Sequence, residues 1–205
     1  MRKWLGLLAL CIASISTLAI AEQGFSRRDL SSALLQKVML YRTKSGRMVF
    51  VRHCKRSPSG CVKRIELFSS MIFESATRHH IPVDIFAAMA VHESGLNPFA
   101  IGKYSEKGIF QLHPKGPGRG IQFVRDDVYW ERCKRLDSAC QKQVIDRAAK
   151  ELERGLLRCR TLKKALGYYN TGKCDGDAVY VKRILYQRKR LIPQYQVAAA
   201  EVLGR

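Results

Sequence analysis

The carboxyl group of Glu93 is the strongest candidate for chemistry in this sequence. Glu93 follows Met89 by four residues and Ala90 by three, and on a helix these intervals place the carboxyl group on the same face as the apolar side chains. Gly95 predicts that the helix ends at this glycine, two residues after Glu93. Burial and the negative end of the helix dipole both raise the pKa of a carboxyl group, as a general acid near neutral pH requires. The alternative is a helix-terminal glutamate that reaches solvent.

The elements that position this carboxyl group are predicted to be helices. Apolar residues at helical or alternating spacing predict helices at 29–39, 64–79, 82–95, 141–157, 162–169 and 178–189, and a strand at 48–51. Residues 96–129 are rich in Gly and Pro and lack such periodicity. An irregular stretch of this length inside a domain is unusual and is often functional. The fold class is therefore predicted to be mainly α.

Residues 1–21 have the pattern of a secretory signal peptide. Arg2 and Lys3 precede an apolar run over 4–20, which ends in the small-x-small cleavage pattern Ala19-Ile20-Ala21. An uncleaved membrane anchor is the alternative, but the run is short for a membrane span and contains Ser and Thr. No later segment of the sequence is long and apolar enough to cross a bilayer. The mature chain is expected to be exported, either periplasmic or secreted.

The cysteines predict disulfides. Cleavage of the signal peptide removes Cys11 and leaves six cysteines, and an even number in an oxidising compartment favours disulfide bonds. Their spacing suggests three local pairs, Cys54 with Cys61, Cys133 with Cys140 and Cys159 with Cys174. A zinc site is the alternative. It is disfavoured because no two of these cysteines lie two to four residues apart and no helix carries a His-x-x-x-His pair.

The charge of the chain points to a polyanionic environment. The formal net charge is +20, while 46% of the residues are hydrophobic, so the chain can bury a core and is not a disordered polycation. Nucleic acid, anionic lipid and cell-wall polymer all fit such a charge. Export and the absence of any aromatic-interleaved basic motif make nucleic acid the least expected partner.

Three short blocks in the order Glu-Ser, Gly-x-x-Gln and Tyr-Asn support a more specific hypothesis. They are Glu93-Ser94, Gly108-Ile109-Phe110-Gln111 and Tyr169-Asn170, followed by Tyr180. This ordered set resembles the catalytic domain of the soluble lytic transglycosylases, a lysozyme-like fold related to goose-type lysozyme. The resemblance covers about residues 64–190. It implies one lysozyme-like domain at 63–190. The patterns outside this domain predict the signal peptide at 1–21, a small basic N-terminal appendage at 22–62 and a C-terminal tail at 191–205.

The resemblance also implies an activity and roles for single residues. Glu93 would be the only acid/base in cleavage of the β-1,4 bond between N-acetylmuramic acid and N-acetylglucosamine, with a 1,6-anhydro product. Ser94 would hold the helix end, and the substrate-binding residues would be Ser94, Gln111, His113, Tyr169, Asn170 and Tyr180. The expected partners are peptidoglycan strands and the anionic wall surface. A monomer is favoured, and no cofactor or metal is implied because acid/base cleavage of a sugar needs none.

Two positions depart from the family pattern, and two other functions stay open. Gly102 stands where a Ser is common, and His113 stands where an apolar residue is usual. A goose-type lysozyme that hydrolyses the same bond would use a second carboxylate, for which Glu106, Asp126 and Asp127 are the candidates. A non-catalytic basic module that only binds the cell wall is the alternative from another class.

Overall fold

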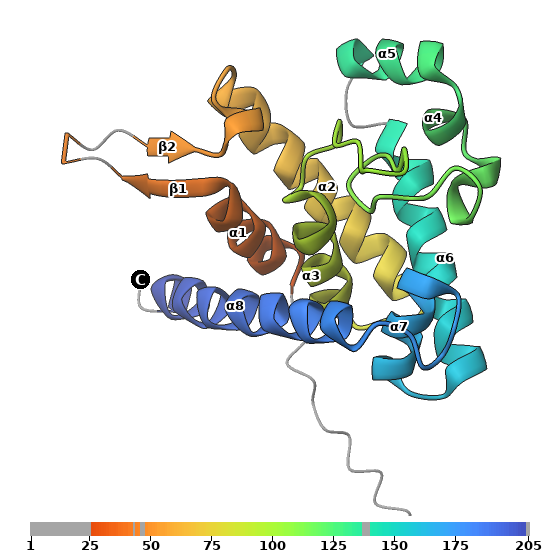
Figure 1. The fold of residues 1–205 in the computed structure, drawn as a ribbon. Coiled ribbons are helices and arrows are strands. Elements are labelled where there is room, and N and C mark those ends of the chain that lie inside the picture. Colours follow the sequence, from red (N-terminus) through yellow and green to blue (C-terminus); the bar gives the residue numbers. More distant parts are fainter. Residues whose placement is uncertain (1–25, 43, 46–47, 137–139, 204–205) are drawn as a thin grey trace, which may run out of the picture.

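Helices form most of the described chain, as the spacing of apolar residues predicts. The structure is a computed structural model, and it describes residues 26–42, 44–45, 48–136 and 140–203, so the predicted signal peptide lies outside the described residues. The long helices are α1 (Arg27–Val38), α2 (Pro58–Arg78), α3 (Val83–Ser94), α6 (Gln141–Cys159), α7 (Leu162–Thr171) and α8 (Ala178–Leu203). They are arranged around α3 (Figure 1). The prediction of a mainly α fold is confirmed.

Two helices are longer than their apolar pattern indicates. Helix α2 begins at Pro58, because proline is well suited to the first turn of a helix, where its missing N–H is not needed. Helix α8 continues to Leu203, through residues that the sequence sets apart as a tail. The irregular stretch 96–129 also contains short elements, a 3₁₀ turn η2 (Pro117–Gly120), α4 (Gln122–Arg125) and the start of α5 (Asp127–Leu136).

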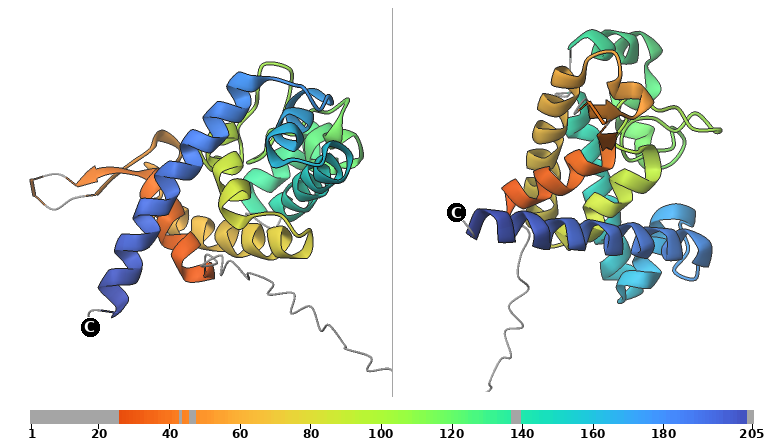
Figure 2. Two further views of the ribbon diagram at one scale, coloured as in Figure 1. Left: turned by 90° about the horizontal axis from the view of Figure 1, so that it is seen from below. Right: turned by 90° about the vertical axis from the view of Figure 1, so that its left-hand side faces the viewer.

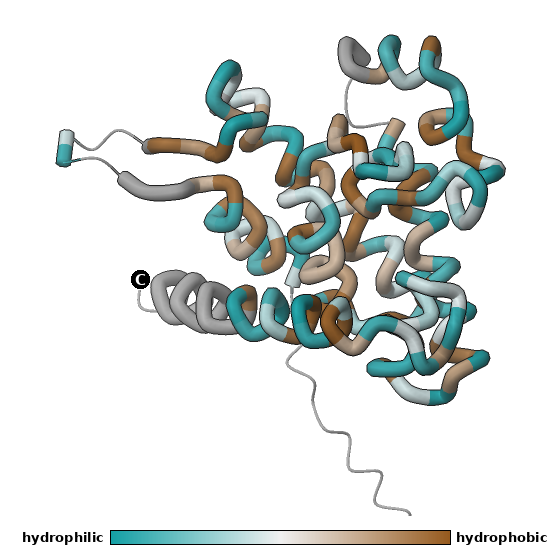
Figure 3. Tube along the Cα trace, in the orientation of Figure 1, coloured by the Kyte–Doolittle hydropathy of each residue, from teal (hydrophilic) through white to brown (hydrophobic). Residues whose placement is uncertain are grey.

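Helix α3 is the centre of the core. Its residues from Ile85 to Ala90 are all fully buried, and a helix that is apolar on every side must be covered by other elements. Helices α1, α2 and α8 pack against it, and Figure 3 shows hydrophobic residues, in brown, along the traces of these helices. The amino end of α3 is tied to α8 by an ion pair between Asp84 and Arg188. Glu93 therefore lies at the end of the most deeply buried helix.

The N-terminal segment shares this core. Leu30, Leu34 and Val38 of α1 are completely buried in the same hydrophobic cluster as α3. The Nζ atom of Lys37 donates a hydrogen bond to the backbone carbonyl of Arg190 in α8 (2.9 Å). The described part of the segment expected to be an appendage thus packs on the helical body. Within this described part, the antiparallel hairpin of β1 (Met39–Arg42) and β2 (Met48–Phe50) projects from the body (Figures 1 and 2).

The described residues contain three disulfides, each close to the end of a helix. Their pairs are Cys54–Cys61, Cys133–Cys140 and Cys159–Cys174, the same pairs that the spacing suggests. The last one connects the end of α6 to the segment after α7, and it therefore encloses α7. No helix in the described part of the chain is long and apolar enough to cross a membrane.

Candidate active site

Glu93 occupies the last turn of α3, and the backbone after it turns sharply. Gly95 adopts φ 59° and ends the helix, a left-handed conformation that glycine reaches without steric cost. Ser94 donates a hydrogen bond from its hydroxyl to the backbone carbonyl of Ile109 (3.0 Å). This bond connects the end of α3, which carries Glu93, to the loop that follows the helix.

The Glu93 carboxyl group lines a cavity of about 720 Å³. One wall is the loop 102–117, which contributes Gln111 and His113 among others. The other wall is made by α6 and α7, and α7 contributes Tyr169 and Asn170. Segments far apart in sequence thus meet around one carboxyl group, in an open space large enough for a ligand of several sugar-sized units.

The pKa of Glu93 is raised from 4.5 to about 7. Burial of the carboxyl group is the main cause, and the nearby charge of Glu106 raises the pKa further, while a hydrogen bond from Tyr180 lowers it. The Tyr180 hydroxyl donates that bond to Oε1 of Glu93 (2.6 Å). The carboxyl group is therefore close to half protonated at neutral pH, which is the condition for a group that both gives and takes a proton.

Tyr180 reaches Glu93 from α8 and is not among the residues that line the cavity. Its ring is buried and meets the His92 ring edge-on, with the centroids 5.4 Å apart. Burial and the charge of Arg183 lower the pKa of His92, so the imidazole is neutral at neutral pH. His92 faces Tyr180 and supports the phenol ring that donates to Glu93.

Two side chains fix the loop on the opposite wall. The Nε2 atom of Gln111 donates to the backbone carbonyls of Ala100 (3.1 Å) and Gly108 (2.8 Å). The Tyr169 hydroxyl donates to the backbone carbonyl of Phe110 (3.0 Å). Burial, with the charges of two cavity glutamates, raises the pKa of Tyr169 well above 10. Tyr169 therefore stays a neutral donor that joins α7 to the loop.

Gly102 leaves space for other groups in the cavity. A Cβ atom at this position would collide with the Glu106 carboxylate and would lie 2.8 Å from the side-chain oxygen of Gln111. Glu106 accepts a hydrogen bond from the backbone N–H of Tyr104 (2.8 Å). Where a serine hydroxyl is common in the family pattern, this chain places the Glu106 carboxylate.

The three candidate second carboxylates lie in different places. Glu106 lines the same cavity as Glu93. Asp126 accepts a hydrogen bond from the backbone N–H of Tyr129 (2.9 Å) and caps the start of α5. Asp127 lines a separate hollow and forms an ion pair with Lys107. The structure thus brings only Glu106 of these three to Glu93.

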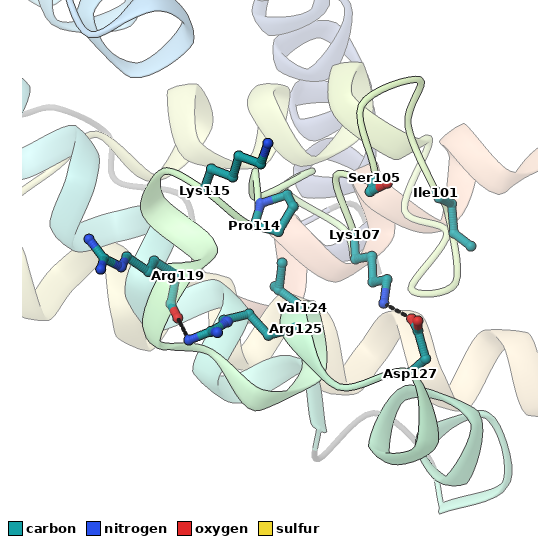
Figure 4. Close-up of a pocket in the computed structure, with 9 residues that line it drawn as sticks. All are labelled: Ile101, Ser105, Lys107, Pro114, Lys115, Arg119, Val124, Arg125 and Asp127. Atoms are coloured by element: carbon teal, nitrogen blue, oxygen red, sulfur yellow. Dashed lines mark hydrogen bonds and ion pairs between the residues drawn. The ribbon is translucent and has the colours of Figure 1, made fainter.

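The separate hollow beside α4 has a volume of about 650 Å³ and is rich in cations. Figure 4 shows the Lys107 side chain directed at Asp127, and Arg125 directed at the backbone of Arg119. These contacts are the ion pair already described and a hydrogen bond to the Arg119 carbonyl (3.2 Å). The two cations thus have partners within the chain.

Helix α6 contributes cavity residues that the sequence reading does not single out. Arg147, Glu151 and Arg154 all line the cavity with Glu93. Their spacing of four and three residues places them on one helical stripe, and this spacing was the available signal. The sequence does not distinguish this stripe from a solvated one, because charged residues opposite an apolar face normally point into solvent.

One group of potential metal ligands occurs among the described residues. His53, Cys54 and Cys61 bring their ligand atoms within 4.8 Å of one another. The two sulfur atoms are bonded to each other, so neither is the thiolate that a zinc ion requires. This group does not fit a metal.

Comparison with known proteins gives one match. A family model described as the transglycosylase SLT domain matches residues 70–179, which include Glu93, the loop and α7. No curated protein and no solved structure matches the chain. The match spans more than half of the 205 residues. The chain therefore belongs to the transglycosylase SLT domain family, whose fold is lysozyme-like, and membership of this family implies a transglycosylase that acts on peptidoglycan.

Proposed function

We propose that this protein is an exported lytic transglycosylase that cleaves the β-1,4 bond between N-acetylmuramic acid and N-acetylglucosamine, with Glu93 as the only acid/base. The observation that carries the proposal is the Glu93 carboxyl group, which lines the cavity with a pKa of about 7. Family membership indicates peptidoglycan as the substrate class, and the raised pKa suits a group that donates and accepts a proton near neutral pH.

The reaction needs one carboxyl group because the substrate supplies the nucleophile. Glu93 donates its proton to the oxygen that links the two sugars, and the bond between that oxygen and the anomeric carbon breaks. The Glu93 carboxylate then accepts the proton of the muramoyl 6-hydroxyl as its oxygen attacks the same anomeric carbon. The products are a free 4-hydroxyl and a 1,6-anhydro end, and Glu93 is protonated again.

Neighbouring groups support both halves of this cycle. Tyr180 donates to the Glu93 carboxylate, which stabilises the form that accepts the second proton. Gln111, Tyr169 and Asn170 line the cavity and are proposed to border the sugar rings. His113 lines the same cavity. Ser94 and Tyr180, the other two residues expected to bind substrate, contact the backbone of Ile109 and the Glu93 carboxyl group.

Mass spectrometry of released muropeptides tests the proposal. Wild-type protein should release products that lack the mass of one water at each new end, and Glu93→Gln should release none. Glu66→Gln is the matched control, because Glu66 is an exposed glutamate of α2 outside the cavity. Retention of glycan cleavage by Glu93→Gln would show that another group is the acid.

Hydrolysis is a second candidate function, which Glu106 favours. Its carboxylate lines the same cavity and its charge raises the pKa of Glu93, so it is placed to activate a water molecule as a second carboxylate. A hydrolase would release reducing ends that contain the added water, and Glu106→Gln would abolish this product. If the protein is a transglycosylase, Glu106→Gln should still form the anhydro product.

A further inference from the structure

A charged stripe on α6 forms one wall of the active-site cavity. Oε1 of Glu151 lies 3.1 Å from Nε of Arg147, and Oε2 of Glu151 lies 3.1 Å from Nη1 of Arg154. The Glu151 side chain is only 7% exposed, whereas the Arg147 and Arg154 side chains are 31% and 51% exposed. A buried carboxylate thus holds two half-exposed guanidinium groups side by side in the cavity.

Stability alone does not account for this arrangement. A buried carboxylate has a large desolvation cost, which its ion pairs only offset, and an apolar residue in such a place is often as stable or more so. Exposed ion pairs between residues three or four apart on a helix contribute only about 0.5 kcal/mol or less. Binding of a ligand therefore explains the three groups better than stability does.

Charge and geometry indicate the ligand class. Glu151 neutralises one of the two arginines, so the three groups together have an excess positive charge. Each guanidinium group has five N–H donors in a planar fork. Arg154 donates one hydrogen bond from Nη1 to Oε2 of Glu151, whereas Arg147 contacts Glu151 as an ion pair. The remaining donors match a carboxylate, which arginine binds with two parallel hydrogen bonds.

We propose that Arg147 and Arg154 form a carboxylate-binding site, positioned by Glu151, that recognises the acidic substituent of the muramoyl sugar. This inference rests on the proposed function, because that function supplies the muramoyl strand as the substrate. The hydroxyl and acetamido groups of such a strand are neutral. The carboxylates of such a strand lie on the lactyl ether, where it is free, or on the peptide attached to it. The site therefore selects muramoyl strands over neutral glycans.

Three substrates and two variants test this site. The substrates are peptide-bearing strands, strands freed of peptide by an amidase, and peptide-bearing strands whose carboxyl groups are converted to neutral amides with carbodiimide and glycinamide. The variants are Arg154→Gln, whose half-exposed side chain makes misfolding unexpected, and the double variant Arg147→Gln/Arg154→Gln. Lys150→Gln is the control, because Lys150 is an exposed cation of the same helix outside the cavity. Anhydro ends are counted to obtain KM and kcat separately.

We expect the double variant to have a KM about tenfold higher than the wild type on carboxylate-bearing strands, because one charge-assisted bidentate contact is lost. The change in kcat should be smaller. A loss confined to peptide-bearing strands assigns the site to the peptide, and a loss confined to peptide-free strands assigns it to the lactyl carboxylate. On the neutralised strands the wild type should lose its advantage, so that both proteins show the same KM.

An equal rise in KM on all three substrates, or no rise on any, would overturn the carboxylate site while wild-type anhydro products still support the proposed function. Wild-type products that contain added water would instead overturn the transglycosylase mechanism. In that case a carboxylate-dependent KM would still support the site. The two proposals therefore fail by different observations.

Discussion

At the scale of single residues, the protonation of Glu93 governs the proposed activity. Its pKa of about 7 results from burial and from the charge of Glu106, against the opposing hydrogen bond from Tyr180. The group must be protonated in the free enzyme to act as an acid, so its pKa sets the alkaline limit of kcat/KM. The two neighbours provide independent ways to move that limit.

The pH profile tests this assignment. We expect kcat/KM to fall above about pH 7, by roughly tenfold per pH unit well beyond the pKa. Tyr180→Phe removes a donor that stabilises the carboxylate, so the pKa rises and the alkaline limb moves to higher pH. Glu106→Gln removes a nearby negative charge, so the limb moves to lower pH. If the alkaline limb of the kcat/KM profile does not move in either variant, the group that titrates is not Glu93.

The same pKa predicts a stability effect. Below about pH 4.5 the folded and unfolded states both hold the proton, so Glu93 has no effect on the pH dependence of unfolding. Between the unfolded value of 4.5 and the folded value of about 7, only the folded state keeps the proton, so the free energy of unfolding falls as pH rises. Above pH 7 the cost reaches roughly 3 kcal/mol.

Glu93→Gln should therefore be more stable than the wild type at high pH. Glutamine keeps the size of the side chain and an oxygen that accepts from Tyr180, but it has no charge to bury. Thermal unfolding followed by circular dichroism at pH 5 and pH 8 measures the difference. We expect the advantage of the variant to grow by several degrees from the lower to the higher pH. A constant difference would mean that Glu93 does not titrate in this range.

At the scale of elements, a disulfide, a close contact with α6 and a hydrogen bond to the loop hold α7 in place. The disulfide Cys159–Cys174 encloses α7, and Gly155 of α6 allows its close approach, because a Cβ there would lie 3.0 Å from the Ala165 carbonyl oxygen. Tyr169 then reaches from α7 to the loop carbonyl of Phe110. The wall of the cavity opposite the loop thus depends on covalent and steric restraints rather than on α7 alone.

Removal of this disulfide should affect both stability and activity. The loop it closes spans 15 residues, for which chain entropy predicts a stabilisation of about 3 kcal/mol. We expect Cys159→Ser/Cys174→Ser to lose about this much in urea unfolding and to show lower glycan cleavage below its unfolding transition, since Tyr169 and Asn170 lose their fixed position. The pair Cys54→Ser/Cys61→Ser, remote from α7, is the control for activity. Equal activity losses in both would argue against a local effect on α7.

At the scale of the whole molecule, the net charge of +20 predicts retention on an anionic wall. Such attraction is long-range and is screened by salt. Binding of the protein to purified sacculi, measured by sedimentation, should fall several-fold between about 0.05 M and about 0.5 M NaCl, as the Debye length shortens. Glu93→Gln should bind with the same salt dependence, which separates binding from cleavage. Binding to sacculi that does not change with salt concentration would mean that the cavity, and not the net charge, provides the affinity.

The sequence by itself determined the helices and singled out the candidate for the acid. Apolar residues recur at helical spacing in α3 and α6, and this local pattern needs no knowledge of distant contacts. Glu93 could be identified because its position on the apolar face of α3 and the ordered motifs around it are both properties of neighbouring residues. The cysteine pairs were also accessible, since each closes a short loop.

Tertiary structure decided the environment of that acid. The contact of Tyr180 with Glu93 joins residues 87 positions apart, and only the crossing of α3 and α8 sets its geometry. Glu106 and Asp127 look alike in sequence, yet packing directs one into the cavity and the other to Lys107. The α6 stripe of Arg147, Glu151 and Arg154 looks solvated in sequence, yet α7 and the loop line the same cavity with it. Helical pattern is a local property, whereas burial, and with it pKa and ligand chemistry, depends on what covers each face.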